Sequence, residues 1–491
     1  MAEIKPFDKS SGFYPERNRG IKFGTDGWRA VISDTFTFDN VKKVAQAMAD
    51  YVRTQRTVLS GREFKVVVGY DTRFLSDRYA ELTARVMASN GIPVILADRP
   101  CPTPSVSYAI KDKNLVGGVV ITASHNPARY NGMKYKAYYS GSAGPDITKK
   151  IELLLGANQV LCEPIGELKL KGLVAIENIV PRHIDFIKRY VNLGLIKKTP
   201  LKVIVDSMYG TGNSYISELL KRGKCRVDTI HDTVNPSFGG INPEPIMPNL
   251  KELVLTAKKG KYSIGLATDG DADRLGVILS DGRPLTGHKV MTLLLLHLLE
   301  DRKMRGDVIQ TICGTVLIEK ICKKYGLKMH ETQVGFKYIC GLMGKDDILI
   351  GGEETGGVAF KNYIPERDGI LSGLLILEML SKRRKSLDRI IKDIEKEYGR
   401  YEYRRLDIRV PDEKKKALME LLKTRPLKKV LDKEVVEVKD CDGYKFILKD
   451  RSWFMMRLSG TEPIVRIYAE APSGKRAMAM LEFGKKLLED I

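Results

Sequence analysis

The sequence predicts a multidomain α/β protein with layers of mainly parallel strands, followed by a smaller α+β domain from about residue 400. Three observations predict this fold class. The 491 residues correspond to three or four domains at a typical size of ~150 residues. A short β-branched run, a glycine-containing turn and an amphipathic helical segment recur along the chain, as in parallel sheets covered by helices. After residue 400 a lysine-rich helical stretch and two strand runs replace that pattern.

The strand-turn-helix units are expected, as strand and helix, over 64–73 with 76–90, 201–212 with 213–222, and 307–315 with 316–326. Ser76 is placed to cap the first of these helices, and residues 92–97 supply a further strand. In sheets of this kind the catalytic loops leave the carboxyl ends of the strands, so we expect the functional residues in the turns.

Three joints divide the chain: the first two each end a helical pattern just before a new strand run, and at the third the sequence pattern changes. They lie over 191–202, 299–307 and 395–410. We therefore expect domains over 1–190, 191–303, 304–400 and 401–491. In the last domain, two strand runs flank Asp442-Gly443, which predicts a hairpin.

Composition narrows the class of protein. The longest apolar run, 290–299, is interrupted by Thr292 and His297 and is shorter than the ~20 residues that cross a bilayer. The polar N-terminus lacks the apolar segment of a secretory signal, so we expect a cytoplasmic protein without a membrane span. Seven scattered cysteines, with no Cys-x-x-Cys pair, favour reduced thiols over a disulfide framework or a zinc knuckle.

The net charge of +21 favours anionic partners such as phosphates, phosphosugars or nucleic acid. The basic runs over 381–386 and 412–417 have acidic neighbours and lack aromatic residues that could stack on bases. We interpret them as solvated helix faces and expect no nucleic-acid partner.

The segment TDGDADR over 268–274 places three carboxylates, Asp269, Asp271 and Asp273, at alternate positions. Each negative charge raises the cost of ionising the next, so a cation is expected among them. Hard oxygen ligands suit Mg²⁺, and an EF-hand calcium loop is disfavoured because its twelfth position is Ser280 and not Glu. Arg274 would offset part of the charge. A solvated acidic turn is the alternative.

The segment 119–136 begins as a buried strand and ends in a turn that carries Ser124 and His125. A serine at the carboxyl end of a strand is placed like a nucleophile or a phosphate carrier. Lys134 adds an acid/base group or a phosphate clamp. An ordinary polar turn is the alternative reading of the same residues.

Two later loops offer binding groups. In 349–357 the glycines permit close backbone approach, while Glu353 and Thr355 can bond sugar hydroxyls. The segment RLSGTEP over 457–463 has a phosphate-binding composition, supplied by Arg457, Ser459, Gly460 and Thr461. For each loop a purely structural turn is the alternative.

Taken together, the loops resemble the α-D-phosphohexomutases, and within them the phosphoglucomutase/phosphomannomutase branch. The resemblance rests on six motifs in order: FGTDGWRA (23–30), GYDTR (69–73), TASHNP (122–127), DGDADR (269–274), GGEETGG (351–357) and RLSGTEP (457–463). It implies three related α/β domains plus a smaller C-terminal domain around a central cleft, with one active-site loop from each domain.

The resemblance also implies a role for each matching residue. Ser124 would be the phosphoserine, and Mg²⁺ would be held by Asp269, Asp271, Asp273 and an oxygen of the serine phosphate. His125 and Lys134 would lie beside the phosphoserine, with Lys134 as a proton carrier. Glu353 and Thr355 would contact the sugar. The phosphate that is not transferred would be held by Arg457, Ser459, Gly460 and Thr461, and the basic cleft would be lined by Arg29, Arg73, Arg274 and Lys337.

The implied activity is the reversible conversion of hexose 1-phosphate into hexose 6-phosphate through phosphoserine and a 1,6-bisphosphate, with glucose 1,6-bisphosphate as activator. The sugar would be glucose, mannose or both, and the protein a monomer or a homodimer. Many members carry Ser where this chain has Thr355, some carry His in place of Gly357, and Glu354 replaces a Met usual in phosphoglucosamine mutases. The alternatives are a mutase for glucosamine or pentose phosphates, a Mg²⁺-dependent phosphohydrolase and a basic nucleic-acid-binding protein.

Overall fold

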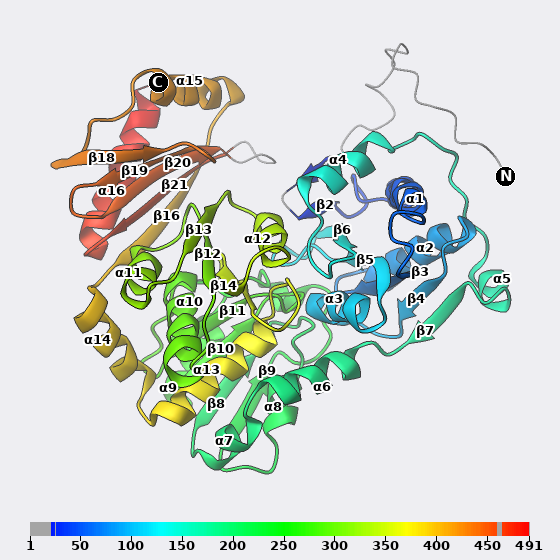
Figure 1. The fold of residues 1–491 in the computed structure, drawn as a ribbon, viewed down its shortest axis with the longest axis horizontal. Coiled ribbons are helices and arrows are strands. Elements are labelled where there is room, and N and C mark those ends of the chain that lie inside the picture. Colours follow the sequence, from blue (N-terminus) through cyan, green and yellow to red (C-terminus); the bar gives the residue numbers. More distant parts are fainter. Residues whose placement is uncertain (1–20, 25, 459–463, 491) are drawn as a thin grey trace.

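The structure, a computed structural model, describes residues 21–24, 26–458 and 464–490. These residues form four sheets, each with its own helices (Figure 1). The first domain lies at the right of Figure 1, the second and third lie below and beside it, and the fourth is at the upper left. The predicted four-domain α/β architecture is therefore confirmed.

The first domain holds a mixed sheet in the order β1-β2-β6-β5-β3-β4-β7. Its elements are β1 (Phe23–Gly24), β2 (Gly27–Val31), α1 (Phe38–Thr54), β3 (Glu63–Tyr70), α2 (Ser76–Ser89), β4 (Val94–Ala97), α3 (Thr103–Asp112), β5 (Leu115–Ile121), β6 (Tyr130–Ala137), α4 (Pro145–Leu153), α5 (Ile165–Leu170), β7 (Val174–Glu177) and α6 (Val180–Tyr190). Helix α2 begins at Ser76 as predicted, but its N-cap is Leu75. Ser76 Oγ instead donates to Asp71 Oδ1 over 2.8 Å, so the predicted Ser76 cap is wrong.

The second domain holds the sheet β11-β10-β8-β9. Its elements are α7 (Leu193–Lys198), β8 (Lys202–Asp206), α8 (Tyr215–Leu220), β9 (Arg226–Ile230), η1 (Phe238–Gly240), α9 (Lys251–Gly260), β10 (Ile264–Thr268) and β11 (Leu275–Leu279). Helix α10 (Gly287–Leu296) and the π-helical turn η2 (His297–Asp301) connect it to the third domain.

The third domain holds the sheet β13-β12-β14-β15. Its elements are β12 (Asp307–Thr311), α11 (Val316–Tyr325), β13 (Met329–Thr332), α12 (Phe336–Met343), β14 (Ile348–Gly352), β15 (Val358–Phe360), α13 (Gly369–Arg383) and α14 (Leu387–Tyr398).

The fourth domain is an antiparallel sheet in the order β16-β21-β20-β19-β18-β17, with two helices. Its elements are β16 (Glu402–Arg409), α15 (Asp412–Thr424), β17 (Lys429–Val430), β18 (Lys433–Lys439), β19 (Tyr444–Leu448), β20 (Trp453–Leu458), β21 (Ile464–Ala471) and α16 (Gly474–Glu489). Strands β18 and β19 pair antiparallel, so the predicted hairpin about Asp442-Gly443 is present.

The three α/β sheets share one topological step. In each, a strand of the parallel core (β5, β10 or β14) is followed by an antiparallel neighbour (β6, β11 or β15). The connection between the two strands is the loop that carries Ser124, the three aspartates or Glu353. The sheets are thus mixed, and the expectation of mainly parallel strands applies to their cores but not to their antiparallel edges.

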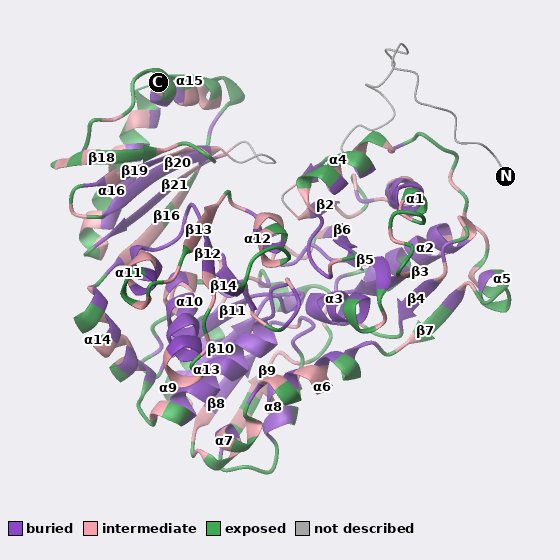
Figure 2. Ribbon diagram, in the orientation of Figure 1, coloured by how far each residue is buried: buried purple, intermediate pink, exposed green. Residues whose placement is uncertain are grey.

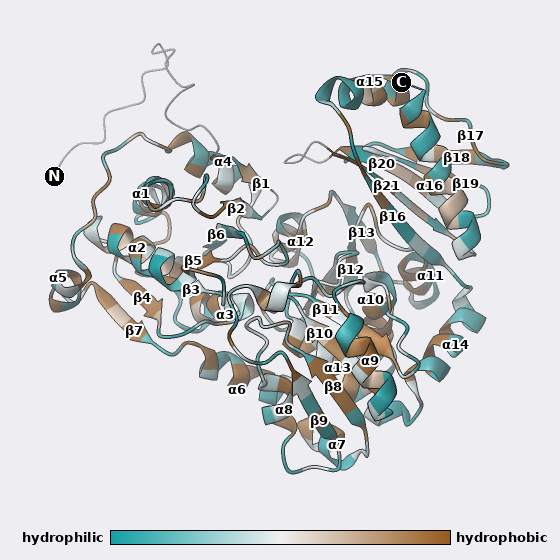
Figure 3. Ribbon diagram, turned by 180° about the vertical axis from the view of Figure 1, so that it is seen from behind, coloured by the Kyte–Doolittle hydropathy of each residue, from teal (hydrophilic) through white to brown (hydrophobic). Residues whose placement is uncertain are grey.

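The second and third domains share one hydrophobic core. Helix α13 is buried from Gly369 to Ser381 and contacts both β11 and α10. Figure 2 shows the central strands and α13 as buried, and Figure 3 shows β8 and α13 as hydrophobic while the outer helix α14 is mostly hydrophilic. These two domains therefore provide a single rigid support for their loops. Among the described residues, every helix is too short or too polar to cross a membrane.

A buried polar network joins the first domain to the third. Lys136 Nζ donates to Glu366 Oε2 over 2.5 Å, and Ser107 Oγ donates to the same oxygen over 3.0 Å. Both charged side chains are fully buried. Because a buried charge is costly without its partner, this pair fixes the first domain against the segment that leads into α13.

Replacing Glu366 with Ala should leave Lys136 buried without its carboxylate and lower the free energy of unfolding by about 3–5 kcal/mol. The measurement is urea unfolding followed by circular dichroism. The control is Asp185→Ala, which removes an exposed pair with Lys188 and should change stability by less than about 1 kcal/mol. Equal effects of the two substitutions would contradict the role given to the buried pair.

Candidate active site

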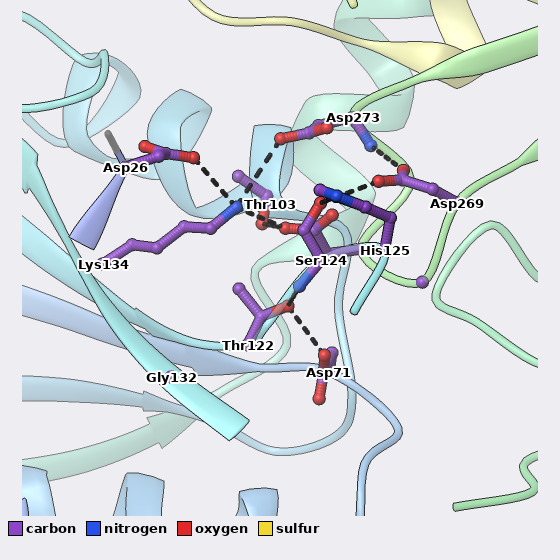
Figure 4. Close-up of polar contacts among 12 residues, drawn as sticks. Asp26, Asp71, Thr103, Thr122, Ser124, His125, Gly132, Lys134, Asp269 and Asp273 are labelled. Carbon is purple, nitrogen blue, oxygen red and sulfur yellow. Dashed lines mark hydrogen bonds and ion pairs between the residues drawn. The ribbon is translucent and has the colours of Figure 1, made fainter. Parts of the chain in front are cut away.

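Ser124 lies in the loop after β5, in a conformation that its neighbours hold in place (Figure 4). Its φ of +52° is in the left-handed region, which is uncommon for a residue other than glycine. The Ser124 N–H donates to Thr122 Oγ1 over 2.8 Å, and Thr122 Oγ1 donates to Asp71 Oδ2 over 2.7 Å. The strained turn presents the hydroxyl towards the acidic loop of the second domain.

The three aspartates lie together in the loop between β10 and β11. Asp269, Asp271 and Asp273 are fully buried and each offers a carboxylate oxygen, these oxygens lying within 4.8 Å of one another. Asp269 Oδ2 accepts from Ser124 Oγ over 2.9 Å, and its Oδ1 accepts from the N–H groups of Asp273 and Arg274. The serine and the acidic loop, predicted separately from the sequence, therefore meet across the boundary of two domains.

Cations surround this acidic loop. Lys134 Nζ lies 2.9 Å from Asp271 Oδ2, 3.1 Å from Asp26 Oδ2 and 3.7 Å from Asp273 Oδ2. Burial acts to lower the pKa of Lys134, but the three carboxylates outweigh it and raise that pKa, so Lys134 is protonated at neutral pH. Arg274 Nε lies 4.0 Å from Asp269 and 3.8 Å from Asp273.

The donor set fits a hard divalent cation. Burial, together with the charges of Asp273 and Asp271, raises the pKa of Asp269 well above its usual value. Within the described part of the chain, Asp271 Oδ1 and both carboxylate oxygens of Asp273 are buried without a hydrogen bond, although Asp273 Oδ2 forms an ion pair with Arg367 Nη2 at 2.7 Å. Buried carboxylate oxygens that lack hydrogen bonds and lie close together suit Mg²⁺, which takes one or a few carboxylates and completes its shell with water or phosphate oxygens.

His125 and Arg29 both contact residues of the serine turn. His125 Nδ1 is 3.4 Å from Ser124 Oγ. Burial, and the positive charges of Arg274 and Arg29, lower the pKa of His125 well below its usual value, so its ring is neutral at pH 7. Arg29 Nη1 donates to Asn126 Oδ1 over 2.7 Å.

Arg73 holds the serine loop through several hydrogen bonds. Its guanidinium donates to the carbonyl oxygens of Ser124, Asn126, Pro127 and Tyr130 and pairs with Asp71. We expected Arg73 to line the wall of the cleft. In the structure its side chain is instead buried against the serine loop. Arginine suits this position because its planar fork can serve several acceptors at once.

The predicted sugar-binding residues follow β14. Glu353 Oε2 lies 3.1 Å from Arg367 Nη1, and burial raises the pKa of Glu353 while Arg367 opposes that rise. Thr355 borders a cavity of about 1050 Å³ that extends to Tyr403 of β16. Its Oγ1 is buried without a hydrogen-bond partner among the described residues. Lys337 lies in α12 with its Nζ 5.5 Å from the Tyr338 ring, and burial lowers its pKa.

The phosphate-binding motif of the fourth domain is described in part. Arg457 is the penultimate residue of β20, and its Nε lies 2.8 Å from Asp442 Oδ2. Ser459, Gly460 and Thr461 lie outside the described residues.

Three residues at this site were not singled out from the sequence. Asp26 pairs with Lys134, Thr103 Oγ1 donates to Asp271 Oδ2 over 2.7 Å, and Arg367 pairs with Asp273 and Glu353. Asp26 stands in the motif FGTDGWRA, where it could have been noticed. Thr103 and Arg367 stand in segments with no local signal, because Asp271 and Asp273, their partners in the acidic loop, lie in another domain.

Comparison with known proteins gives matches along most of the chain. Family models match in order: "Phosphoglucomutase/phosphomannomutase, alpha/beta/alpha domain I" over residues 20–159, domain II over 181–282, domain III over 286–398 and the C-terminal domain over 406–483. A phosphoglucomutase/phosphomannomutase of Thermococcus kodakarensis is 32% identical over 96% of this chain and 99% of its own length.

Two further relatives differ in the sugar that their names give. A phosphoglucosamine/phosphogalactosamine mutase of Sulfurisphaera tokodaii is 30% identical over 96% of this chain and 99% of its own length. The crystal structure of a putative phosphomannomutase from Thermus thermophilus superposes with a TM-score of 0.83, at 32% identity, over 96% of this chain and 99% of that chain.

Replacing Asp269 with Asn should weaken Mg²⁺ binding by about tenfold or more and stabilise the metal-free protein. Folding raises the pKa of Asp269, so its ionised form is disfavoured in the folded chain at pH 7 and a neutral side chain removes that cost. The measurement is the melting temperature in EDTA and across a Mg²⁺ titration.

The matched control is Asp281→Asn, which changes a half-exposed aspartate paired with Arg283 and should leave the Mg²⁺ titration unchanged. An Asp269→Asn variant with wild-type Mg²⁺ dependence would remove the cation from this loop.

Proposed function

Because this chain belongs to the phosphoglucomutase/phosphomannomutase family of phosphohexomutases, we propose that it interconverts the 1-phosphate and 6-phosphate of glucose, mannose or both. The observation that carries the proposal is the meeting of Ser124 with the three buried aspartates, 2.9 Å from serine oxygen to carboxylate oxygen. A phosphoryl carrier beside a cation site is the arrangement that such a transfer needs.

In the proposed cycle, phosphorylated Ser124 gives its phosphoryl group to the free hydroxyl of a hexose monophosphate. The bond from phosphorus to the serine oxygen breaks as the bond to the sugar oxygen forms, which yields a hexose 1,6-bisphosphate. The bisphosphate reverses its orientation and returns its other phosphoryl group to Ser124. Glucose 1,6-bisphosphate would act as activator by loading an unphosphorylated chain.

The residues of this chain would supply position and charge, which dominate phosphoryl transfer. Mg²⁺, when held by Asp269, Asp271, Asp273 and an oxygen of the serine phosphate, would neutralise charge on the transferring group. Lys134 is already protonated, so it would stabilise negative charge or give up a proton. When the Ser124 hydroxyl takes a phosphoryl group back from the bisphosphate, its proton would pass to neutral His125, whose Nδ1 is 3.4 Å from Ser124 Oγ.

Substrate binding would involve the third and fourth domains. Glu353 and Thr355 would contact hydroxyls that both orientations of the sugar present similarly. Lys337, Arg29 and Arg274 would add positive charge, and the phosphate that is not transferred would be held by Arg457, Ser459, Gly460 and Thr461.

A second candidate substrate is an amino sugar phosphate. Its support is the 30% identical relative named as a phosphoglucosamine/phosphogalactosamine mutase. Glu354 argues for the neutral hexoses, because phosphoglucosamine mutases usually carry Met at this position. In this chain Glu354 Oε2 accepts a hydrogen bond from Thr311 Oγ1 over 3.1 Å.

A coupled assay with Mg²⁺ and a trace of glucose 1,6-bisphosphate should convert glucose 1-phosphate or mannose 1-phosphate into the 6-phosphate without release of inorganic phosphate. Glucosamine 1-phosphate is offered separately, and the ratio of kcat/KM values assigns the sugar. Faster turnover of the amino sugar would replace the proposed substrate, while phosphate release without isomerisation would indicate a phosphohydrolase.

Replacing Ser124 with Ala should lower kcat by roughly 10³-fold or more, since the phosphoryl carrier is lost. Binding of hexose 6-phosphate, measured by isothermal titration, should change little because the sugar contacts lie in other loops. The control is Ser381→Ala, which changes a buried serine bonded within α13. Substantial mutase activity in the Ser124→Ala variant would exclude Ser124 as the carrier.

A further inference from the structure

Arg367 lies at the meeting point of segments from three domains. Its Nη2 is 2.7 Å from Asp273 Oδ2 and 2.9 Å from Asp26 Oδ2, and its Nη1 is 3.1 Å from Glu353 Oε2. The first carboxylate belongs to the acidic loop, the second to the first domain and the third to the sugar-binding loop. One guanidinium therefore contacts all three.

These contacts are buried, which strengthens them. Arg367 is 3% exposed, Asp273 is fully buried and Glu353 is 7% exposed. Two buried carboxylates that share a neighbourhood repel each other strongly unless a cation lies between them. Arginine can fill that place because its fork binds several carboxylates in a fixed geometry, which a lysine ammonium cannot do.

The position of Arg367 depends on a glycine in the sugar-binding loop. A Cβ atom on Gly357 would lie 2.3 Å from Arg367 Cδ and 2.9 Å from its Cγ. Such distances are far inside van der Waals contact, and burial leaves the arginine little room to retreat. Gly357 therefore opens the space through which the Arg367 side chain reaches Asp273 and Glu353.

We propose that Arg367 is a positioning residue that fixes Glu353 relative to the acidic loop, and that Gly357 is its required partner. The inference rests on the proposed function, because it treats Glu353 as the group that contacts the sugar. It assigns to this chain a pair, Gly357 and Arg367, that sets where the sugar lies relative to Ser124 and the cation.

A positioning role for Arg367 and a merely structural role lead to different effects on cation binding. Arg367 lies 2.7 Å from Asp273, so its charge would repel a cation held by the acidic loop, and removing the guanidinium would lower that repulsion. Arg367→Gln should therefore leave Mn²⁺ binding unchanged or tighter, while kcat/KM for the hexose phosphate falls by roughly 10²-fold, as expected for a misplaced sugar contact.

The experiment compares Arg367→Gln, Gly357→Ala and the double variant by steady-state kinetics and by Mn²⁺ titration followed by electron paramagnetic resonance. Gly357→Ala should give the same pattern, because the added methyl group displaces Arg367 without changing a charge. The double variant should lose no more kcat/KM than the more impaired single variant, since both changes remove one interaction.

The control is Arg302→Gln, which removes another arginine that spans packed segments, paired with Glu378 at 2.6 Å and away from the site. It should lower the melting temperature without changing kcat/KM or Mn²⁺ binding. Additive losses in the double variant, or weaker Mn²⁺ binding in Arg367→Gln, would overturn the proposal. Absence of wild-type turnover would instead count against the proposed function, and the Mn²⁺ titrations would still decide the role of Arg367.

Discussion

The site depends on the balance of charge around the loop that carries Asp269, Asp271 and Asp273. These carboxylates are fully buried, where repulsion between like charges is strongest. Lys134 reaches them from the first domain and Arg367 from the third. The attraction between these cations and the aspartates lowers the cost of burying the carboxylates, and it also holds three domains together. The position of each active-site loop is therefore coupled to the charges on the other loops.

The same strand connection, repeated in the three α/β sheets, brings the functional loops together. In each α/β sheet the functional loop joins a parallel core strand to its antiparallel neighbour. Such a connection starts at the carboxyl end of the core strand, where ligand sites gather in α/β proteins. The shared core of the second and third domains and the buried pair of Lys136 and Glu366 then fix the sheets relative to one another.

The sequence predicts the parts of this site that are local. The alternate spacing of the aspartates, the strand before Ser124 and the hairpin about Asp442-Gly443 depend on neighbouring residues, and the structure contains each of them. It does not predict Thr103, whose partner Asp271 lies 168 positions away in another domain. It does not predict Arg367 either, because two of its partners, Asp26 and Asp273, lie in other domains. The sequence also does not predict the contacts of Arg73 and Ser76. Arg73 binds carbonyl groups of the serine loop and Ser76 binds Asp71, and these groups come together only when the chain folds.

The central claim is that Ser124 carries the phosphoryl group and that the acidic loop supports its transfer. The most direct measurement incubates the protein with radiolabelled glucose 1,6-bisphosphate, with Mg²⁺ or with EDTA, and maps the labelled residue by peptide mass spectrometry. The account predicts one labelled site, Ser124, formed rapidly only when Mg²⁺ is present. Label on another residue, or isomerisation that proceeds without label on Ser124, would contradict it.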